Sequence, residues 1–295
     1  MSAVITRRRV LGLATGLLLA PAAVCAGGRR VAAIDWAALE TALLLDVVPV
    51  AATELLQFRQ IAVEPRVPST VADIGLRGTP NYEALRLAAP DLILISNFYE
   101  RQRGALERIA PVLSLPVYEP GVPPYARAAE ATATLGQVLG RDAEARAAVA
   151  RADETIAGLR AALHGVPRRP VFVISVGDAR HIRAFGADSM FGDVLDRLGF
   201  ENAWTTGTSY AAAAPLGIEA LARVPDATVL VVEPVPAEAR RTLADSALWE
   251  ALPMVRDNRV ATIAPVNHFG GLPAAVRFAR LAAEALREQG RRTHG

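Results

Sequence analysis

Residues 125–163 of this chain, YARAAEATATLGQVLGRDAEARAAVARADETIAGLRAAL, decide its fold. Alanine, arginine and glutamate dominate this stretch and β-branched residues are few, a composition that favours helix. Its larger apolar residues recur at spacings that place them on one helical face: Leu135, Val138, Leu139, Val149, Ile156 and Leu159. A break at residues 140–142 interrupts the pattern, and the sequence HGVP at 164–167 ends it by C-cap chemistry. We therefore predict a long linker helix within residues 121–166.

The sequence before this helix alternates between buried strands and short helices. Apolar runs at residues 30–34, 71–74 and 91–96 are typical of strands, and each is bounded by turn or helix signals. Helical patterns lie between them, at 37–45 and 81–89. Strands that alternate with helices form mainly parallel sheets, so residues 29–120 are predicted to form one α/β lobe.

The sequence after the helix repeats the scheme. Strands are predicted at residues 170–175, 227–233 and 259–263, with helices at 190–198, 218–223 and 273–287. Residues 167–290 therefore form a second lobe. The predicted fold is α/β: two Rossmann-like lobes with mainly parallel sheets, joined by a single long helix. Because a helix between the lobes is stiff, we expect them to close by only a few degrees.

The N-terminus is predicted to be an export signal. An arginine pair within TRRRVL at 6–11 precedes the apolar run 11–23, the layout of a twin-arginine signal peptide cleaved after Ala26. The run has about 13 residues, too short for a helix that crosses the bilayer. The predicted location is the periplasm. The alternative is a lipid on Cys25 that tethers the protein to a membrane, although the residue before Cys25 fits that motif poorly.

Composition excludes several classes of function. The net charge is +2, lysine is absent, and the arginines are interspersed with acidic residues, so we predict no binding of nucleic acid. Cys25 is the only cysteine, and the four histidines have no paired spacing, so no metal site is expected. No nucleophile elbow, phosphate-binding loop or paired catalytic carboxylates occur, so we predict that the protein is not an enzyme.

Several segments in order carry a family resemblance. They include RVAAIDW at 30–36, DIGLRGTPN at 73–81, RIAP at 108–111, DARH at 178–181, NAW at 202–204 and PMVR at 253–256. With these segments the chain resembles the periplasmic ferric hydroxamate binding proteins of the helical-backbone class. The resemblance implies a monomer that binds a ferric siderophore and delivers it to the permease and ATPase of an ABC importer. It implies no intrinsic cofactor, because the iron(III) is carried within the siderophore.

The resemblance also implies two ligand-binding residues, Arg77 and Tyr99. A ferric hydroxamate already fills the iron coordination sites with its own oxygens, so the protein needs only donors to those oxygens. Arginine supplies a charged planar fork of donors and tyrosine one directed hydroxyl. The plainer alternative is that Arg77 pairs with a surface carboxylate and Tyr99 caps a strand end.

The chain departs from the family where tryptophans would line the pocket. Ile61, Ala211 and Asn267 occupy those positions, with Tyr210, His268 and Phe269 at or beside them. The predicted pocket is therefore less aromatic and more polar, lined by Ile61, Tyr210, Asn267, His268 and Phe269. The alternative ligands on this fold are haem, a corrinoid or a catecholate siderophore, and Tyr99 or His268 would be the axial ligand of a haem.

One internal repeat pairs two glutamates. Glu83-Ala84-Leu85 precedes a proline, an aspartate and an apolar strand, and Glu219-Ala220-Leu221 does the same. The simplest interpretation is a duplicated helix–turn–strand unit whose acids favour a helix start. The resemblance implies more, since related proteins use one exposed glutamate per lobe to dock arginine pockets on the permease. Glu83 and Glu219 are the predicted docking residues.

Overall fold

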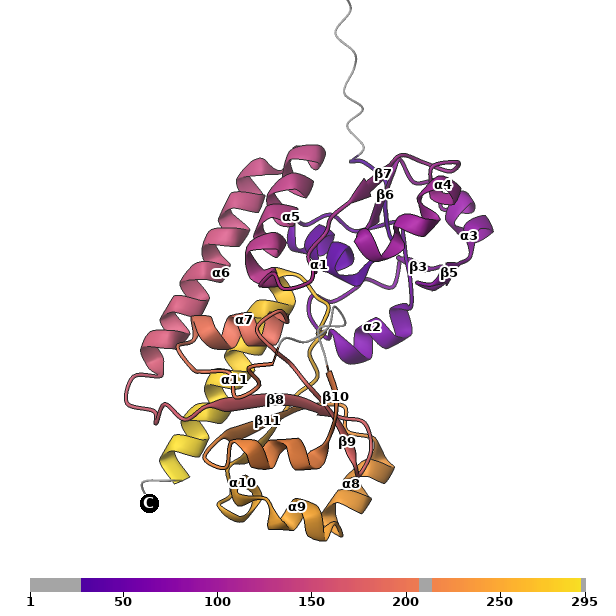
Figure 1. Ribbon diagram of the computed structural model, residues 1–295. Coiled ribbons are helices and arrows are strands. Elements are labelled where there is room, and N and C mark those ends of the chain that lie inside the picture. The colour runs from indigo at the N-terminus through magenta and orange to yellow at the C-terminus, as the bar shows by residue number, and fades with distance from the viewer. Residues whose placement is uncertain (1–27, 207–213, 293–295) are drawn as a thin grey trace, which may run out of the picture.

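The structure is a computed structural model that describes residues 28–206 and 214–292. The predicted signal peptide, Cys25, Tyr210 and Ala211 lie outside the described residues. Two lobes, each built on a five-stranded sheet, lie one above the other, and long helices run along one side of both (Figure 1). The two-lobed α/β fold predicted from the sequence is therefore confirmed.

The first lobe has an entirely parallel sheet of strand order β3-β2-β1-β6-β7. Its strands are β1 (Val31–Ala33), β2 (Ala51–Ala52), β3 (Ala72–Asp73), β6 (Leu92–Ile95) and β7 (Val112–Ser114). Its helices are α1 (Trp36–Leu44), α2 (Leu55–Ile61), α3 (Tyr82–Leu87), the 3-10 helix η1 (Asn97–Gln102) and α4 (Arg103–Leu106). A small hairpin of β4 (Gly75–Leu76) and β5 (Thr79–Pro80) follows β3. The all-parallel order follows from the helical crossovers that separate successive strands.

The second lobe has a mixed sheet of order β10-β9-β8-β11-β12. Its strands are β8 (Val171–Val176), β9 (His181–Ala184), β10 (Ala214–Gly217), β11 (Thr228–Val232) and β12 (Val260–Ile263). Strands β8, β11 and β12 are parallel to one another, and β9 runs antiparallel to both of its neighbours, β8 and β10. Its helices are α7 (Met190–Arg197), the 3-10 helix η2 (Ile218–Arg223), α8 (Ala237–Ala244), α9 (Ala247–Ala251) and α10 (Pro253–Arg256).

The linker differs from the single helix that was predicted. It consists of α5 (Pro124–Leu139) and α6 (Asp142–Ala162), which pack against each other. The chain turns at Gly140, whose φ of 67° is in the left-handed region where glycine is favoured. A Cβ on Gly136 would lie 2.5 Å from the Cβ of Ala145, so the two helices meet at a glycine. Of these two linker helices, α6 is the one that runs from the first lobe to the second (Figure 1).

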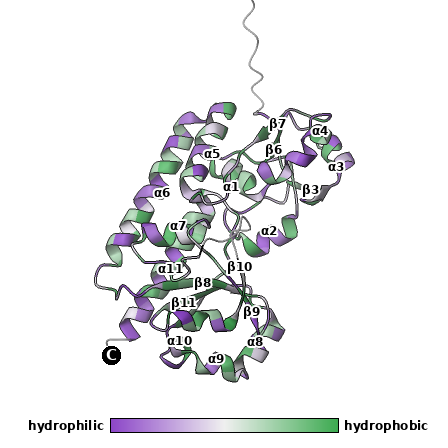
Figure 2. Cartoon of the chain, viewed as in Figure 1, coloured by the Kyte–Doolittle hydropathy of each residue, from purple (hydrophilic) through white to green (hydrophobic). Residues whose placement is uncertain are grey.

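A second helix also bridges the lobes. The last helix, α11 (Leu272–Arg292), contacts α6 and α7, and also α1 and α5 of the first half of the chain. One hydrophobic cluster consequently includes residues of both sheets, such as Leu94 and Val173, together with Phe278 of α11. Figure 2 shows hydrophobic residues along the strands and mixed hydropathy along α6 and α11, which have one face in the core and one in solvent.

Candidate ligand-binding cleft

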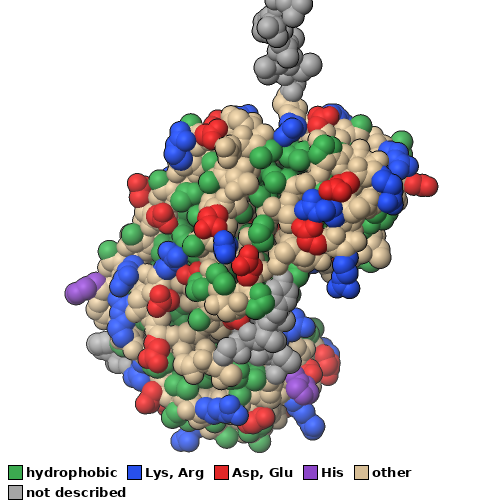
Figure 3. Space-filling model, turned by 45° about the horizontal axis from the view of Figure 1, so that its top comes forward, with side chains coloured by type: hydrophobic (Ala, Val, Ile, Leu, Met, Phe, Trp, Pro, Cys, Tyr) green, Lys and Arg blue, Asp and Glu red, His purple; other side chains and the backbone are tan. Residues whose placement is uncertain are grey.

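A cleft separates the two lobes at the carboxyl ends of their strands. Figure 3 shows the molecule indented between the lobes. A cavity of about 230 Å³ lies there, with Ile61 of α2 on the first-lobe side. Its other lining residues follow the ends of β8, β11 and β12 or come from β9 and α7: Ser175, Val176, Gly177, Arg183, Phe185, Phe191, Val232, Glu233, Pro234, Val266 and His268. Open α/β sheets bind ligands at this end of their strands, so the inter-lobe cleft is the candidate site.

Arg77 is held in place by three residues of its own lobe. It stands in the turn of the β4–β5 hairpin, where Gln102 donates hydrogen bonds to the carbonyls of Arg77 and Gly78. Its Nε–H donates to Oε2 of Glu54 over 2.7 Å, and its backbone N–H donates to Oε1 over 3.0 Å. Its guanidinium carbon also lies 3.9 Å from the ring centroid of Trp36. These contacts fix the side chain while it remains 26% exposed.

The carboxylate partner leaves the outer nitrogens of Arg77 available. The ion pair with Glu54 uses Nε, and within residues 28–206 and 214–292 the Nη1 and Nη2 groups make no hydrogen bond. Trp36 is itself anchored, because its Nε1–H donates to the carbonyl of Thr53 over 3.1 Å. The plainer alternative, in which Arg77 pairs with a carboxylate, is thus present as the ion pair with Glu54. The same ion pair positions the guanidinium with its two outer nitrogens available as donors.

Tyr99 supplies a protonated hydroxyl on the same lobe. Its backbone N–H closes the turn after β6 by donating to the carbonyl of Ser96, and its side chain is half-buried. Burial, then the charge of Asp35, raises the pKa of Tyr99 to about 12. This raised pKa keeps the proton on the hydroxyl at neutral pH. The hydroxyl has no hydrogen-bond partner among the described residues, so it is a donor without an internal acceptor.

The buried carboxyl of Asp35 connects two elements of the first lobe. Asp35 accepts from the backbone N–H groups of Ala37 and Ala38 at the start of α1, and from the hydroxyl of Ser96 over 2.9 Å. Burial raises the pKa of Asp35. The carboxyl thereby ties α1 to the end of β6, from which η1 and Tyr99 follow.

His268 lines the cleft as a neutral ring. It lies in the loop between β12 and α11, and its ring packs against Phe185 and Phe269 at centroid distances of 5.8 and 4.6 Å. Burial lowers the pKa of His268 to about 4, and the positive charges of Arg183 and Arg77 add to the effect. At neutral pH the ring is therefore uncharged, and its pKa is influenced by an arginine from each lobe.

Two other predicted residues of this loop have internal roles. Asn267 is only 2% exposed; its amide donates to Glu40 over 2.7 Å, and its oxygen accepts from the N–H of Phe269 over 3.1 Å. Phe269 packs edge-on against Phe98 and Tyr118. Both contacts join the loop to the first lobe, so Asn267 is withdrawn from the set of residues that we propose to touch the ligand.

The remaining predicted residues fall into three groups. Ile61 lines the cleft. Tyr210 lies outside the described residues. Glu83 and Glu219 are exposed in the first turns of α3 and η2, and the leucine two residues after each of them is completely buried. The two segments thus form the equivalent helix–turn–strand units that the repeat predicted, each with its glutamate directed outward.

Arg183 is the cleft residue that sequence reasoning missed. It belongs to β9, where exposed and buried residues alternate as His181, Ile182, Arg183 and Ala184. In the sequence, this alternation of polar and apolar residues is the pattern of a half-buried strand. It covers only four residues beside a turn, which is too short for a strand to be predicted.

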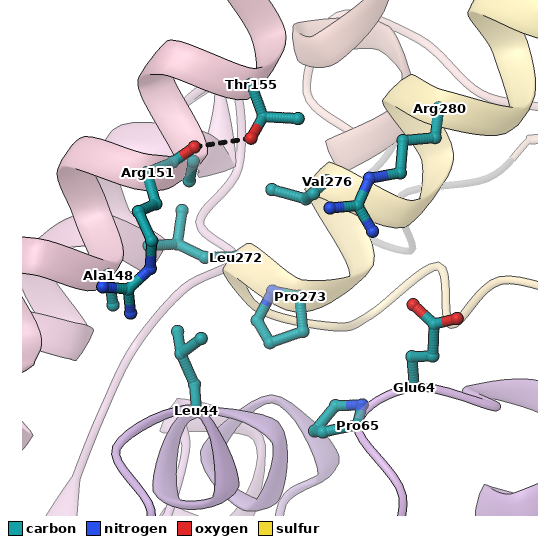
Figure 4. Close-up of a pocket in the computed structure, with 11 residues that line it drawn as sticks. Leu44, Glu64, Pro65, Ala148, Arg151, Thr155, Leu272, Pro273, Val276 and Arg280 are labelled. Atoms are coloured by element: carbon teal, nitrogen blue, oxygen red, sulfur yellow. Dashed lines mark hydrogen bonds between the residues drawn. The ribbon is translucent and has the colours of Figure 1, made fainter.

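A second cavity has a different setting. It has a volume of about 360 Å³ and lies where α6 and α11 meet the end of α1, lined by apolar residues such as Leu44, Leu272 and Val276 (Figure 4). Arg151 and Arg280 flank it from different helices. None of the predicted ligand residues lines it, and it does not adjoin the strand ends, so the inter-lobe cleft is the better candidate.

The described part of the chain lacks two features that would bear on its function. Residues 28–206 and 214–292 contain no group of three or more histidine, cysteine, aspartate or glutamate side chains arranged to hold a metal ion. They also contain no helix long and apolar enough to span a bilayer.

The fold and the cleft define a class of solute-binding protein. Residues 31–266 match the family model described as periplasmic binding protein, and the chain belongs to that family. It is 28% identical to the iron(3+)-hydroxamate-binding protein FhuD of Escherichia coli K12 over 290 residues, which are 96% of this chain and 97% of the relative.

Solved structures of siderophore-binding proteins have the same fold. The chain is 29% identical to FhuD of Vibrio cholerae bound to Fe³⁺–Desferal, with a TM-score of 0.84 over 88% of this chain and 98% of that one. FhuD2 of Staphylococcus aureus with ferrioxamine B is 16% identical, with a TM-score of 0.70 over 89% of this chain and 99% of that one. The helical-backbone architecture expected from the family resemblance is therefore confirmed.

Proposed function

We propose that this protein binds an iron(III)–siderophore of hydroxamate type between its two lobes and delivers it to an ABC importer. Its ligand carries the iron, and the protein contributes only donors and walls. The observation that carries the proposal is the presence of two available donors near each other on the first lobe. One is Arg77, fixed by Glu54 and Trp36 with its outer nitrogens free, and the other is the protonated hydroxyl of Tyr99, which is close enough for the charge of Arg77 to act on its pKa. Both supply hydrogen bonds to the partly negative oxygens around a coordinated ferric ion.

The walls of the cleft suit a compact ligand. Ile61, Phe185, Phe191 and Val266 give apolar surface, and His268 adds a neutral polar ring. Apolar walls with a few convergent polar groups are typical of small-molecule sites. The similarity to FhuD proteins of Escherichia coli and Vibrio cholerae supports a ferric hydroxamate over other ligands of this fold.

Fluorescence of the mature domain tests the ligand. Trp36 lies against Arg77, so its emission should report a ferric complex seated there. We expect saturable quenching by ferrichrome or ferrioxamine B at micromolar or lower concentration, and none by the iron-free ligands. Haem, cobalamin and a ferric catecholate are the competitors. A response to one of them alone would assign the cleft to that ligand and refute the hydroxamate proposal.

Delivery and export complete the proposal. Glu83 and Glu219 dock the loaded monomer on the two permease subunits, supported by their outward placement on equivalent units of the two lobes. Residues 1–26 direct the chain to the periplasm through the twin-arginine route, with Cys25 removed by cleavage after Ala26. Mass spectrometry of the exported protein tests this, because a mature chain that begins at an acylated Cys25 would show a membrane tether instead.

A further inference from the structure

Arg183 is placed by its strand to face the cleft from the second lobe. In β9 the neighbours Ile182 and Ala184 are buried in the lobe, and Arg183 is exposed on the opposite face of the strand. Its Cα partner on β8 is Ser175, which lines the same cavity. Arg183 and Ser175 are therefore neighbours on adjacent strands, and both line the second-lobe wall of the cleft.

The charge of Arg183 is uncompensated. Within the part of the chain that the structure describes, its side chain makes no hydrogen bond and no ion pair. The other charged groups at the cleft are paired: Arg77 with Glu54, and Glu233 with Arg240 over 3.1 Å. His268 is neutral at neutral pH. Counted together with these ion-pair partners, the charged groups at the cleft sum to about one positive charge, and that charge is on the second lobe.

A ligand that fills the cleft removes water from Arg183. Burial of a cation without a partner is unfavourable, and a carboxylate is the partner that a guanidinium binds best, through two parallel hydrogen bonds. A neutral ferric trihydroxamate offers no such partner to the second lobe. A tricatecholate complex carries several negative charges, more than this cleft neutralises. A single pendant or coordinated carboxylate matches the charge.

We propose that Arg183 binds a carboxylate of the ferric siderophore, and that the cleft selects hydroxamate complexes bearing one net negative charge. The inference rests on the proposed function and deepens it. Arg77 and Tyr99 hold the hydroxamate oxygens from the first lobe, while Arg183, assisted by the hydroxyl of Ser175, holds the carboxylate from the second. The two lobes thus bind different parts of one ligand.

Three ligands with an identical iron centre isolate the charge. Ferrioxamine B has a pendant amine and is cationic, its N-acetyl derivative is neutral, and its N-succinyl derivative is anionic. The ferric complex of a citrate-centred dihydroxamate without further carboxylates is the fourth probe, because the citrate carboxylate and its deprotonated hydroxyl complete the iron shell and leave one net negative charge. We expect the wild-type protein to bind the two carboxylate-bearing complexes at least about 10-fold more tightly than ferrioxamine B.

Arg183→Gln is the decisive variant. We expect about 10- to 100-fold weaker binding of the carboxylate-bearing complexes and less than about 3-fold change for the N-acetyl derivative. Arg256→Gln, which removes the same charge from an exposed position of α10, is the matched control. It should change neither the affinity for the carboxylate-bearing complexes nor that for the N-acetyl derivative. Equal effects of Arg183→Gln on all four complexes, or no effect on any, would overturn the inference while hydroxamate binding stands. Failure of the wild-type protein to bind any of the four would refute both.

Discussion

Glu40 of α1 and Asn267 of the loop before α11 are joined by a buried hydrogen bond of 2.7 Å, across 227 positions of sequence. The second carboxyl oxygen of Glu40 accepts from the backbone N–H of Gly271 over 2.8 Å. Close by, the hydroxyl of Tyr118 donates to the carbonyl of Gly270 over 2.7 Å. The loop that carries His268 is therefore fastened to the first lobe, although its neighbouring strand β12 belongs to the second.

The Glu40 carboxyl predicts a dependence of stability on pH. Burial raises its pKa from 4.5 to about 8. Because the folded protein then holds this proton more tightly than the unfolded chain, the contribution to stability is present below pH 4.5 and is lost as the pH rises through 8. We expect a loss on the order of a few kcal/mol across this window, measured by chemical denaturation at a series of pH values.

The Glu40→Gln variant isolates that contribution, since burial also raises the pKa of Asp35. The variant should be about 1–3 kcal/mol less stable at pH 5, because the amide nitrogen cannot accept the hydrogen bond of Asn267 or Gly271. Its stability should change less between pH 5 and 8 than that of the wild type. Glu284→Gln, on the exposed face of α11, is the control. Parallel pH profiles for wild type and Glu40→Gln would contradict the assignment.

Arg77 should contribute directly to affinity. We expect Arg77→Ala to weaken binding of a ferric hydroxamate by about 1.5–3 kcal/mol, because charged hydrogen bonds to the ligand are lost. Glu54→Gln should reduce the affinity by less, since it loosens the position of Arg77 but leaves the donors of the Arg77 guanidinium intact. Arg86→Ala, on exposed α3, is the control of equal charge. Isothermal titration measures all three, and an unchanged affinity for Arg77→Ala would remove it from the site.

Ligand affinity should be insensitive to pH between about 5.5 and 8. The pKa of His268 is lowered to about 4 and that of Tyr99 is raised to about 12, so neither side chain changes its charge in this range. Titrations of a ferrioxamine that retains its own charge across the range check the expectation. A marked change of affinity near pH 6.5 would show that His268 titrates as an ordinary exposed histidine, and His268→Gln would then abolish that change.

The docking residues should affect uptake without affecting binding. We expect the combined Glu83→Ala and Glu219→Ala variant to lose siderophore uptake in cells that express the cognate permease, with ligand affinity unchanged. The matched control removes two exposed glutamates elsewhere, Glu154 of α6 and Glu250 of α9, and should transport normally. A loss of affinity in the first variant would instead place these residues in the binding structure.

The sequence predicted the lobes well and their connection less well. The long apolar strands β6, β8 and β11 are buried on both faces, so their continuous hydrophobic runs were visible. Strand β2 has two residues, too few for a period. Gly140 was recognised as a break, but the reversal of direction depends on the contact of Gly136 with Ala145, a tertiary feature.

The residues of the candidate site were also predicted only in part. Arg77, Tyr99 and Ile61 came from the family resemblance; Ile61 lines the cleft, and the charge of Arg77 acts on both Tyr99 and the cleft residue His268. Asn267 was proposed to face the ligand because it stands where the family has a tryptophan, and nothing in the local sequence shows that its partner is Glu40. Arg183 was overlooked since its exposure and lack of a partner are properties of the folded sheet.

Helix α11 also determines when the chain is able to fold during synthesis. It packs against α1 and α5 near the start of the fold as well as α6 and α7, yet it ends at residue 292. Neither lobe has its complete hydrophobic core until α11 has left the ribosome. Stable folding must therefore follow translation through α11, and nascent chains that lack this helix would expose apolar helix faces to chaperones and proteases.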